Sequence, residues 1–219
     1  DDATMRQTVE YAIEKGLAIG AHPGYADKEN FGRTAMSLPL DEIERIVTDQ
    51  VLALRDICEK LGTRLNHVKP HGALYNQAAK DRGLARAIAN FVKKIDSSLV
   101  FYGLSGSVMI EAAMEIGLAT ASEVFADRTY QPDGTLTPRS HPNALIGSTD
   151  ESISQVLQMV RDDTVISTDG RSVPLKAETI CIHGDGEHAV EFAKAIRQAL
   201  TNSGLEVRSI RYDPKNNER

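Results

Sequence analysis

The sequence contains no tryptophan and only 5% aromatic residues, which weakens any function that depends on stacking against bases or sugars. Its 25 Lys and Arg residues are outnumbered by 31 Asp and Glu residues and form no basic stripe. Nucleic acid is therefore not expected as the main partner, because phosphate binding needs clustered cations. No apolar run approaches the roughly 20 residues of a membrane-spanning helix, and no signal peptide is recognisable. We predict a cytoplasmic protein with no membrane partner.

Cysteine is scarce as well, and several catalytic motifs are missing. Cys58 and Cys181 are not spaced like metal ligands, so we interpret them as reduced packing residues. The phosphate-binding pattern G-x-x-x-x-G-K-[ST] and the dinucleotide pattern G-x-G-x-x-G do not occur. Neither G-x-S-x-G nor H-E-x-x-H occurs, which argues against an α/β-type serine hydrolase and a standard zinc peptidase. Catalysis is expected to use a water molecule activated by a carboxylate or a histidine.

Helical and strand patterns alternate along the chain. The spacing of apolar residues predicts helices over about 5–15, 39–61, 78–95, 108–116, 150–161 and 187–202. Short apolar runs predict strands at 17–21, 65–68, 99–103, 118–124, 179–182 and 205–210. The dipeptide Asp169-Gly170 predicts a hairpin turn, and residues 127–146 are expected to form a long loop.

This alternation predicts an α/β protein with a parallel sheet and right-handed crossovers. Short strands that end in polar residues favour a β/α barrel, whose active site is built from the loops after the strands. An open doubly wound sheet is the alternative. The chain begins with a helix, so we expect the first strand to be missing from an N-terminally truncated single domain spanning residues 1–219.

Histidine placement is the most informative feature of the sequence. Five of the six histidines lie at or just after a predicted strand end, namely His22, His67, His71, His183 and His188. A structural role is the simpler interpretation for any one of them. As a group they indicate a shared functional pocket, because strand ends converge on one face of a barrel.

Two segments carry most of this signal. In the strand that ends near Val68, alternation predicts that His67 and Lys69 point to the same side, with His71 just beyond. Lys and His together can stabilise an oxyanion or hold a carboxylate. In the segment 183–188, two glycines allow close approach of a ligand and a helix start attracts anions. Asp185 is expected to act there as an N-cap or a general base.

Polar residues also follow other predicted strands. Glu123, Asp127 and Arg128 lie where the fourth strand ends, and a purely structural ion pair between a carboxylate and the arginine is an open alternative. His22 precedes a loop containing Asn30-Phe31-Gly32-Arg33, which we expect to fold over the pocket.

Five segments resemble the signature segments of the LamB/YcsF family in their order and in their residues. They are 19–23, 30–33, 67–76, 123–128 and 183–188. This resemblance implies a (β/α)7-type barrel like those of glycoside hydrolases and polysaccharide deacetylases. It further implies a subunit of an ATP-dependent 5-oxoprolinase, a hydrolase acting on a cyclic amide. Together with two further subunits (B and C), such a protein converts 5-oxoproline, ATP and water to L-glutamate, ADP and phosphate. Because this sequence has no nucleotide loop, ATP is expected to bind the partner subunits.

We predict roles for individual residues. Asp185 or His183 would act as the base on water, while Lys69, His71 and Arg128 would bind the substrate carboxylate or phosphate and stabilise the oxyanion. The full set of predicted substrate-binding residues is His22, Asn30, Arg33, His67, Tyr75, Glu123, Asp127, Arg128, Glu187 and His188. The Asp-Leu-Asn-x-Asp-type and Cys-Gly-Phe-His-Ala-Gly-Asp-type segments of the family are absent here. Binding of a divalent metal is left open, with His22, His71 and His183 as candidate ligands.

Two other functions are compatible with this sequence. The first is a metal-dependent deacetylase acting on amides of sugars, which a divalent ion held by an Asp and two His would favour. The second is a non-catalytic subunit that presents 5-oxoproline to its partners. Activity of the isolated chain on a phosphorylated lactam would separate the enzyme from such a non-catalytic protein.

Overall fold

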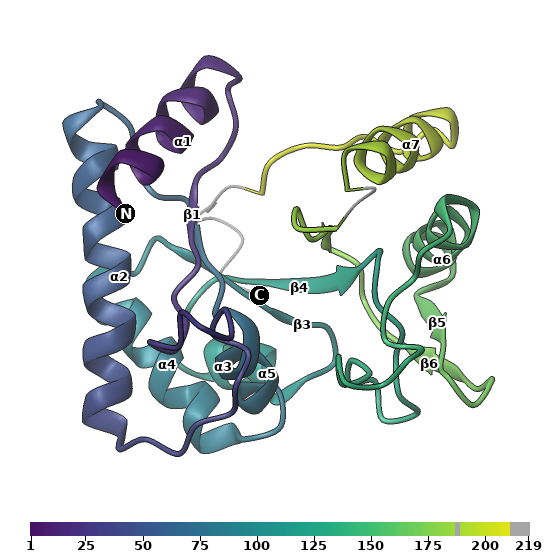
Figure 1. Cartoon of the computed structure of the whole chain (residues 1–219), viewed down its shortest axis with the longest axis horizontal. Helices are drawn as coiled ribbons and strands as arrows, with labels where there is room; N and C mark the ends of the chain where they lie inside the picture. Colours follow the sequence, from purple (N-terminus) through teal and green to yellow (C-terminus); the bar gives the residue numbers. More distant parts are fainter. Residues whose placement is uncertain (187–188, 211–219) are drawn as a thin grey trace. The chain divides into compact units, whose positions relative to one another are not determined.

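The computed structural model describes residues 1–186 and 189–210 and has a mixed α/β fold (Figure 1). The helices are α1 (Asp2–Glu14), α2 (Leu40–Lys60), α3 (Gly72–Ala78), α4 (Arg82–Ile95), α5 (Val108–Glu115), α6 (Thr149–Asp162) and α7 (Ala189–Asn202). The strands are β1 (Gly20–Ala21), β2 (His67–Val68), β3 (Val100–Leu104), β4 (Thr120–Phe125), β5 (Thr164–Ile166), β6 (Ser172–Pro174) and β7 (Thr179–Cys181).

Five of these strands form one sheet in the order β1-β2-β3-β4-β7, and β5 and β6 form a separate antiparallel pair. The pairings β1–β2, β2–β3 and β4–β7 are parallel. The predicted α/β class with a parallel sheet is therefore confirmed. The predicted seven-stranded barrel is not, because the sheet within residues 1–186 and 189–210 has five strands.

The chain divides into two compact units, and the division passes through β3 and β4. Of the described residues, unit 1 comprises 1–103, 108–121 and 209–210, and unit 2 comprises 104–107, 122–186 and 189–208. Each unit carries some of the predicted site residues. The interpretation of residues 1–219 as a single domain stays a prediction.

Unit 1 is built on helices that pack against one another. Helix α2 contacts α1, α4 and strand β1, and α4 contacts α3 and α5. The apolar residues of α2 recur at helical spacing, so Val47 and Val51 lie on one face and are fully buried. On α4, Ile88 and Val92 are likewise fully buried, and Asp81 caps the helix by accepting a hydrogen bond from the Leu84 amide at 3.0 Å.

The two faces of the sheet in unit 1 differ in chemistry. Alternation along β2 and β3 places Val68 and Phe101, both fully buried, on one face. His67 and Tyr102 lie on the opposite face, and their rings stack with centroids 4.1 Å apart. One face thus carries Val68 and Phe101, and the other carries His67 and Tyr102 beside the buried Val100.

In unit 2, helix α6 packs against α7 and β5 (Figure 1). The Ser148 hydroxyl caps α6 by accepting from the Glu151 amide at 3.4 Å. Strands β5 and β6 form the hairpin predicted from Asp169-Gly170, and Gly170 has φ 84°, a conformation that favours glycine. The predicted hairpin is therefore confirmed.

Three expectations about elements differ from the structure. The helix predicted over 78–95 is found as α4, which begins four residues later because the Asp81 side chain caps it, and the preceding helix α3 was not predicted. Strands β1 and β2 have only two residues each, shorter than the predicted 17–21 and 65–68. Residues 205–210 form no strand: Val207 is 46% exposed, and no described segment pairs with this stretch.

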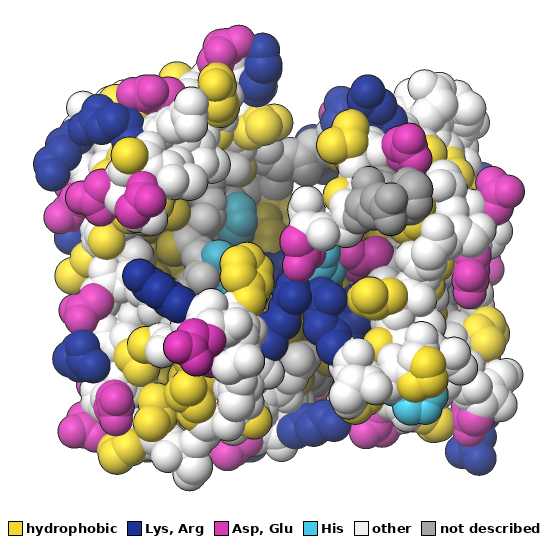
Figure 2. All heavy atoms as spheres, viewed as in Figure 1, with side chains coloured by type: hydrophobic (Ala, Val, Ile, Leu, Met, Phe, Trp, Pro, Cys, Tyr) yellow, Lys and Arg dark blue, Asp and Glu magenta, His cyan; other side chains and the backbone are white. Residues whose placement is uncertain are grey.

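The surface carries charges of both signs. On the face drawn in Figure 2, acidic and basic side chains occur on each unit. None of the helices within residues 1–186 and 189–210 has the length and apolar character needed to cross a membrane.

Candidate active site

In unit 1, the loop after β1 docks onto the segment that follows β2. The amide of Lys69 donates to the Ala21 carbonyl at 3.0 Å, and the amide of His71 donates to the Pro23 carbonyl at 2.8 Å. The amide of Ala73 donates to the Gly32 carbonyl at 3.0 Å. These main-chain bonds bring together two segments that sequence analysis singled out separately.

The docking places His22 against His71, a pair called here the imidazole pair. Their rings meet edge to face with centroids 4.7 Å apart, and Nε2 of His22 lies 3.0 Å from Nδ1 of His71. The outer nitrogens face main-chain carbonyls: Nδ1 of His22 lies 2.6 Å from the Lys69 oxygen, and Nε2 of His71 lies 2.7 Å from the Phe31 oxygen.

These partners fix the protons of the imidazole pair. Carbonyl oxygens only accept, so Nδ1 of His22 and Nε2 of His71 each carry a proton. If both rings were neutral, two lone pairs would face each other at 3.0 Å. One further proton between the facing nitrogens turns this contact into a hydrogen bond. We therefore predict that the imidazole pair holds three ring protons and one positive charge.

Glycines make room for His71. A Cβ atom added at Gly24 would lie 3.1 Å from the His71 Cβ, and one added at Gly32 would lie 3.0 Å from its Cδ2. A Cβ at Gly72 would lie 2.5 Å from the Gly32 carbonyl oxygen, which is main chain and cannot swing aside. Gly32 and Gly72 also have positive φ angles, 67° and 57°. Gly24 and Gly32 thus leave room for His71, and Gly72 allows the close approach of the Gly32 main chain.

His67 has a different environment. Its Nδ1 lies 3.1 Å from the Asn66 Oδ1, and its ring covers the Cα of Gly20, where a Cβ atom would come within 2.0 Å of Nε2. Burial, with a smaller contribution from the charge of Lys69, lowers the pKa of His67 to about 4. His67 is therefore neutral near pH 7, and its stack on Tyr102 is a contact of an uncharged ring.

Other predicted residues of unit 1 support the loop or the interior. The side-chain Nδ2 of Asn30 donates to Asp27 Oδ1 at 2.8 Å, and hydrogen bonds from Thr34 and Asn30 lower the pKa of Asp27. The Arg33 guanidinium lies 5.1 Å from the centroid of the Phe31 ring. Tyr75 lies in α3 and is 3% exposed. Their predicted contacts with substrate, like that of Lys69, stay predictions.

In unit 2, Asp127 and His183 form a pair joined by three contacts. Asp127 accepts from the His183 amide at 2.8 Å, and its two oxygens lie 2.9 and 3.1 Å from Nδ1 of the ring. Burial raises the pKa of Asp127, but the hydrogen bonds and charge of His183 outweigh it, so the pKa lies below its usual value. An ionised Asp127 requires the proton of a neutral His183 to sit on Nδ1, which leaves a lone pair on Nε2.

Helix α6 fixes the segment that carries Asp127. The Ser152 hydroxyl donates to the Ala126 carbonyl at 2.7 Å. The side-chain amide of Gln155 donates to the Phe125 and Arg128 carbonyls at 2.9 and 3.0 Å. These carbonyls flank Asp127 on both sides. The carboxylate is therefore held by the helix as well as by the end of β4.

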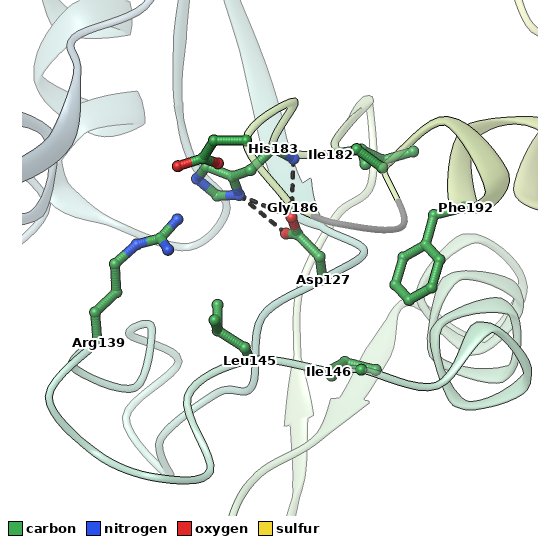
Figure 3. Close-up of a pocket in the computed structure, with 11 residues that line it drawn as sticks. Asp127, Arg139, Leu145, Ile146, Ile182, His183, Gly186 and Phe192 are labelled. Atoms are coloured by element: carbon green, nitrogen blue, oxygen red, sulfur yellow. Dashed lines mark hydrogen bonds and ion pairs between the residues drawn. The ribbon is translucent and has the colours of Figure 1, made fainter. Parts of the chain in front are cut away.

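The Asp127–His183 pair lies in the wall of a cavity of about 230 Å³, called here the Asp127 pocket (Figure 3). Its polar lining includes Asp185 and Arg139, and Figure 3 shows the Arg139 side chain extending from its loop towards His183. Its apolar lining comes from two separate segments of unit 2. It consists of Leu145, Ile146, Ile182, Ala189 and Phe192.

The predictions for unit 2 have different outcomes. The structure brings Asp127, His183 and Asp185 to one pocket. Glu123 and Arg128 are buried, 2% and 3% exposed, and do not line it. Arg128 donates to the Ala144 and Thr137 carbonyls and so organises the loop. Glu187 and His188 lie outside the described residues.

Sequence analysis missed Arg139. It lies in the middle of the region 127–146, of which only the first two residues were predicted to belong to the site and the rest was predicted as a loop. No periodicity marks a functional side chain in such a segment. The region contains two arginines, and only Arg128, which lies next to a predicted strand end, was singled out.

The described residues contain no cluster of three or more His, Cys, Asp or Glu side chains suited to hold a metal ion. In the imidazole pair all four ring nitrogens face protein atoms. Metal binding by His22, His71 or His183 stays a prediction.

Comparison with known proteins decides the family. The LamB/YcsF family model matches residues 1–214. The chain belongs to the LamB/YcsF family. This confirms the resemblance inferred from the motifs.

Several relatives of this LamB/YcsF chain are named as the A subunit of 5-oxoprolinase. The protein of Geobacillus kaustophilus is 52% identical over 215 residues, which cover 98% of this chain and 84% of the relative. That of Bordetella parapertussis is 54% identical over 209 residues, 95% of this chain and 83% of the relative. The crystal structure of a lactam utilization protein from Thermus thermophilus matches with a TM-score of 0.88 and 40% identity, over 96% of this chain and 84% of that one.

Proposed function

We propose that this chain is the lactam-opening subunit of an ATP-dependent 5-oxoprolinase, with His183 as the general base and Asp127 as the residue that orients it. The names of its relatives support the assignment to this system. The observation that carries the residue assignment is the Asp127–His183 pair in the wall of the Asp127 pocket.

The pair has the chemistry that hydrolysis of an amide requires. Asp127 is 14% and His183 25% exposed in their side chains, so water reaches the pair while much of it is shielded. Because Asp127 accepts from Nδ1, the lone pair of Nε2 is available to take a proton. A carboxylate in this position also stabilises the imidazolium that forms.

The proton moves through His183 in two steps. Nε2 takes a proton from water as the water oxygen bonds to the ring carbonyl carbon. The same nitrogen then returns the proton to the lactam nitrogen as the carbon–nitrogen bond breaks. Opening of the phosphorylated ring gives an acyl phosphate of glutamate. A second water molecule then cleaves this acyl phosphate to glutamate and inorganic phosphate. Asp127 keeps its negative charge throughout.

Coupling to ATP is assigned to two partner subunits. A five-membered lactam is little strained and re-forms readily from glutamate, so hydrolysis needs an activated substrate. This sequence carries no phosphate-binding loop of the G-x-x-x-x-G-K-[ST] type. The partners would phosphorylate 5-oxoproline, and this chain would open the activated ring.

The test is 5-oxoproline turnover by the complex reconstituted with its two partner subunits. His183→Gln removes the base, and Asp127→Asn favours the wrong tautomer of His183. Each is expected to lower kcat by a factor of about 10² to 10⁴. The matched control is His141→Gln, because His141 is exposed in the same unit and does not line the pocket.

Wild-type turnover in both His183→Gln and Asp127→Asn would refute the residue assignment. Loss of turnover in His141→Gln to the same extent would mean that the assay reports folding. Release of glutamate by the chain alone from a phosphorylated lactam would distinguish catalysis from presentation of the substrate to the partners.

A further inference from the structure

The Asp127 pocket has an uneven distribution of charge. Two carboxylates line it, Asp127 and Asp185, and Arg139 is the one Lys or Arg residue among the lining residues. Hydrogen bonds with His183 hold Asp127 ionised. An anionic ligand entering this cavity is repelled by the carboxylates and attracted by Arg139.

The position of Arg139 is built into the fold. Thr137, two residues earlier, is fully buried, and its carbonyl accepts from the buried Arg128. The Thr129 hydroxyl lies 2.7 Å from both the Thr137 hydroxyl and the Asn143 carbonyl oxygen. The loop is thus fixed on both sides of Arg139.

The side chain of Arg139 is directed inwards. In Figure 3 its guanidinium extends towards His183, and its Nη2 atom is buried. A guanidinium is planar and presents parallel N–H donors that match the two oxygens of a carboxylate. An arginine held in this way is suited to bind one carboxylate in a defined orientation.

The remaining wall suits a small apolar ring. Leu145, Ile146, Ile182 and Phe192 supply aliphatic and aromatic surface next to the polar pair. The cavity measures about 230 Å³, which is room for a small molecule rather than for a single water. A single five-membered ring with one carboxylate fits this division into a charged end and an apolar wall.

We propose that Arg139 is the specificity residue of the pocket: it binds the carboxylate of a small cyclic amino-acid derivative, while the apolar wall receives its methylene groups. Arg128 is then a positioning residue that acts through the loop. The proposal rests on the proposed function, since it takes the Asp127–His183 pair as the reacting end.

Binding to the full chain tests the proposal without the partners. 5-Oxoproline and its neutral carboxamide differ only in the group that Arg139 would bind, and each is titrated calorimetrically against wild type, Arg139→Gln and Arg139→Lys. Arg139→Gln is expected to weaken 5-oxoproline binding on the order of 10- to 100-fold, the range for a hydrogen bond to a charged group. Its affinity for the carboxamide should stay at the wild-type level.

The Lys variant separates charge from geometry and should recover only part of the affinity, because ammonium lacks the planar fork. The matched control is Arg171→Gln: Arg171 lies in the same unit, has a 75% exposed side chain and pairs with Asp169 at 3.0 Å, away from the pocket lining. Thermal unfolding checks that each variant is folded.

Unchanged 5-oxoproline affinity in Arg139→Gln, or equal loss of both ligands, would overturn the proposal. Binding of neither ligand by wild type would instead count against the proposed function itself. The two failures are therefore distinguishable.

Discussion

Lowering the pH should unfold this protein in part through His67. Burial holds its pKa at about 4 in the folded state, whereas an unfolded histidine has a pKa of about 6.5. At pH values between these two pKa values, the imidazole of His67 is protonated in the unfolded state and neutral in the folded state. The stabilising contribution of neutral His67 is therefore complete above pH 6.5 and is lost as the pH falls towards 4.

The size of the effect follows from the two pKa values. Each unit of difference is worth about 1.4 kcal/mol, so moving from pH 8 to pH 5 should lower the free energy of unfolding by about 2 kcal/mol through this residue alone. Urea unfolding at pH 8 and pH 5 measures it. His67→Gln removes the titration, and the difference between the two proteins cancels the effect of all other acidic and basic groups.

An identical pH dependence in wild type and His67→Gln would refute this reasoning. It would mean that the ring takes up a proton in the folded state as easily as in the unfolded chain. The stack on Tyr102 and the contact with Gly20 would then not enclose it.

Two further predictions concern the same unit. Gly20→Ala should destabilise the fold by about 1–3 kcal/mol because its Cβ meets Nε2 of His67, and adding His67→Ala should relieve that clash. Urea unfolding of the two single variants and the double variant measures the coupling, and strictly additive costs would contradict it. In ¹⁵N spectra of histidine-labelled protein at neutral pH, the imidazole pair should show three protonated ring nitrogens and one unprotonated. Spectra showing that the rings of His22 and His71 are both neutral would disprove the shared proton.

Much of the helical framework could be predicted from the sequence, because long amphipathic patterns leave little choice of structure. Helix α2 was predicted over 39–61 and is found at Leu40–Lys60, followed by Gly62 with φ 73°. The hairpin at Gly170 was predicted for a similar reason, since the turn demands a positive φ angle. These elements depend on local chemistry.

Elements that depend on distant contacts were missed. Helix α3 has seven residues and begins at Gly72, whose place is set by docking against Gly32, forty residues earlier. Residues 205–210 have strand-like composition but no paired neighbour among the described residues. Arg139 is placed by Arg128 and Thr137 inside a loop without any repeat. Sequence spacing carries none of this information.

The histidines show why the site was only partly predictable. Their positions after strand ends indicated function, but the function of an imidazole depends on the atom that faces it. The carbonyls facing the imidazole pair accept from its outer nitrogens and leave a proton to be shared within it. The carboxylate facing His183 binds the proton of Nδ1 and leaves a lone pair on Nε2. Because the facing atoms differ, we predict a shared positive charge for the histidines of unit 1 and propose a base role for the histidine of unit 2.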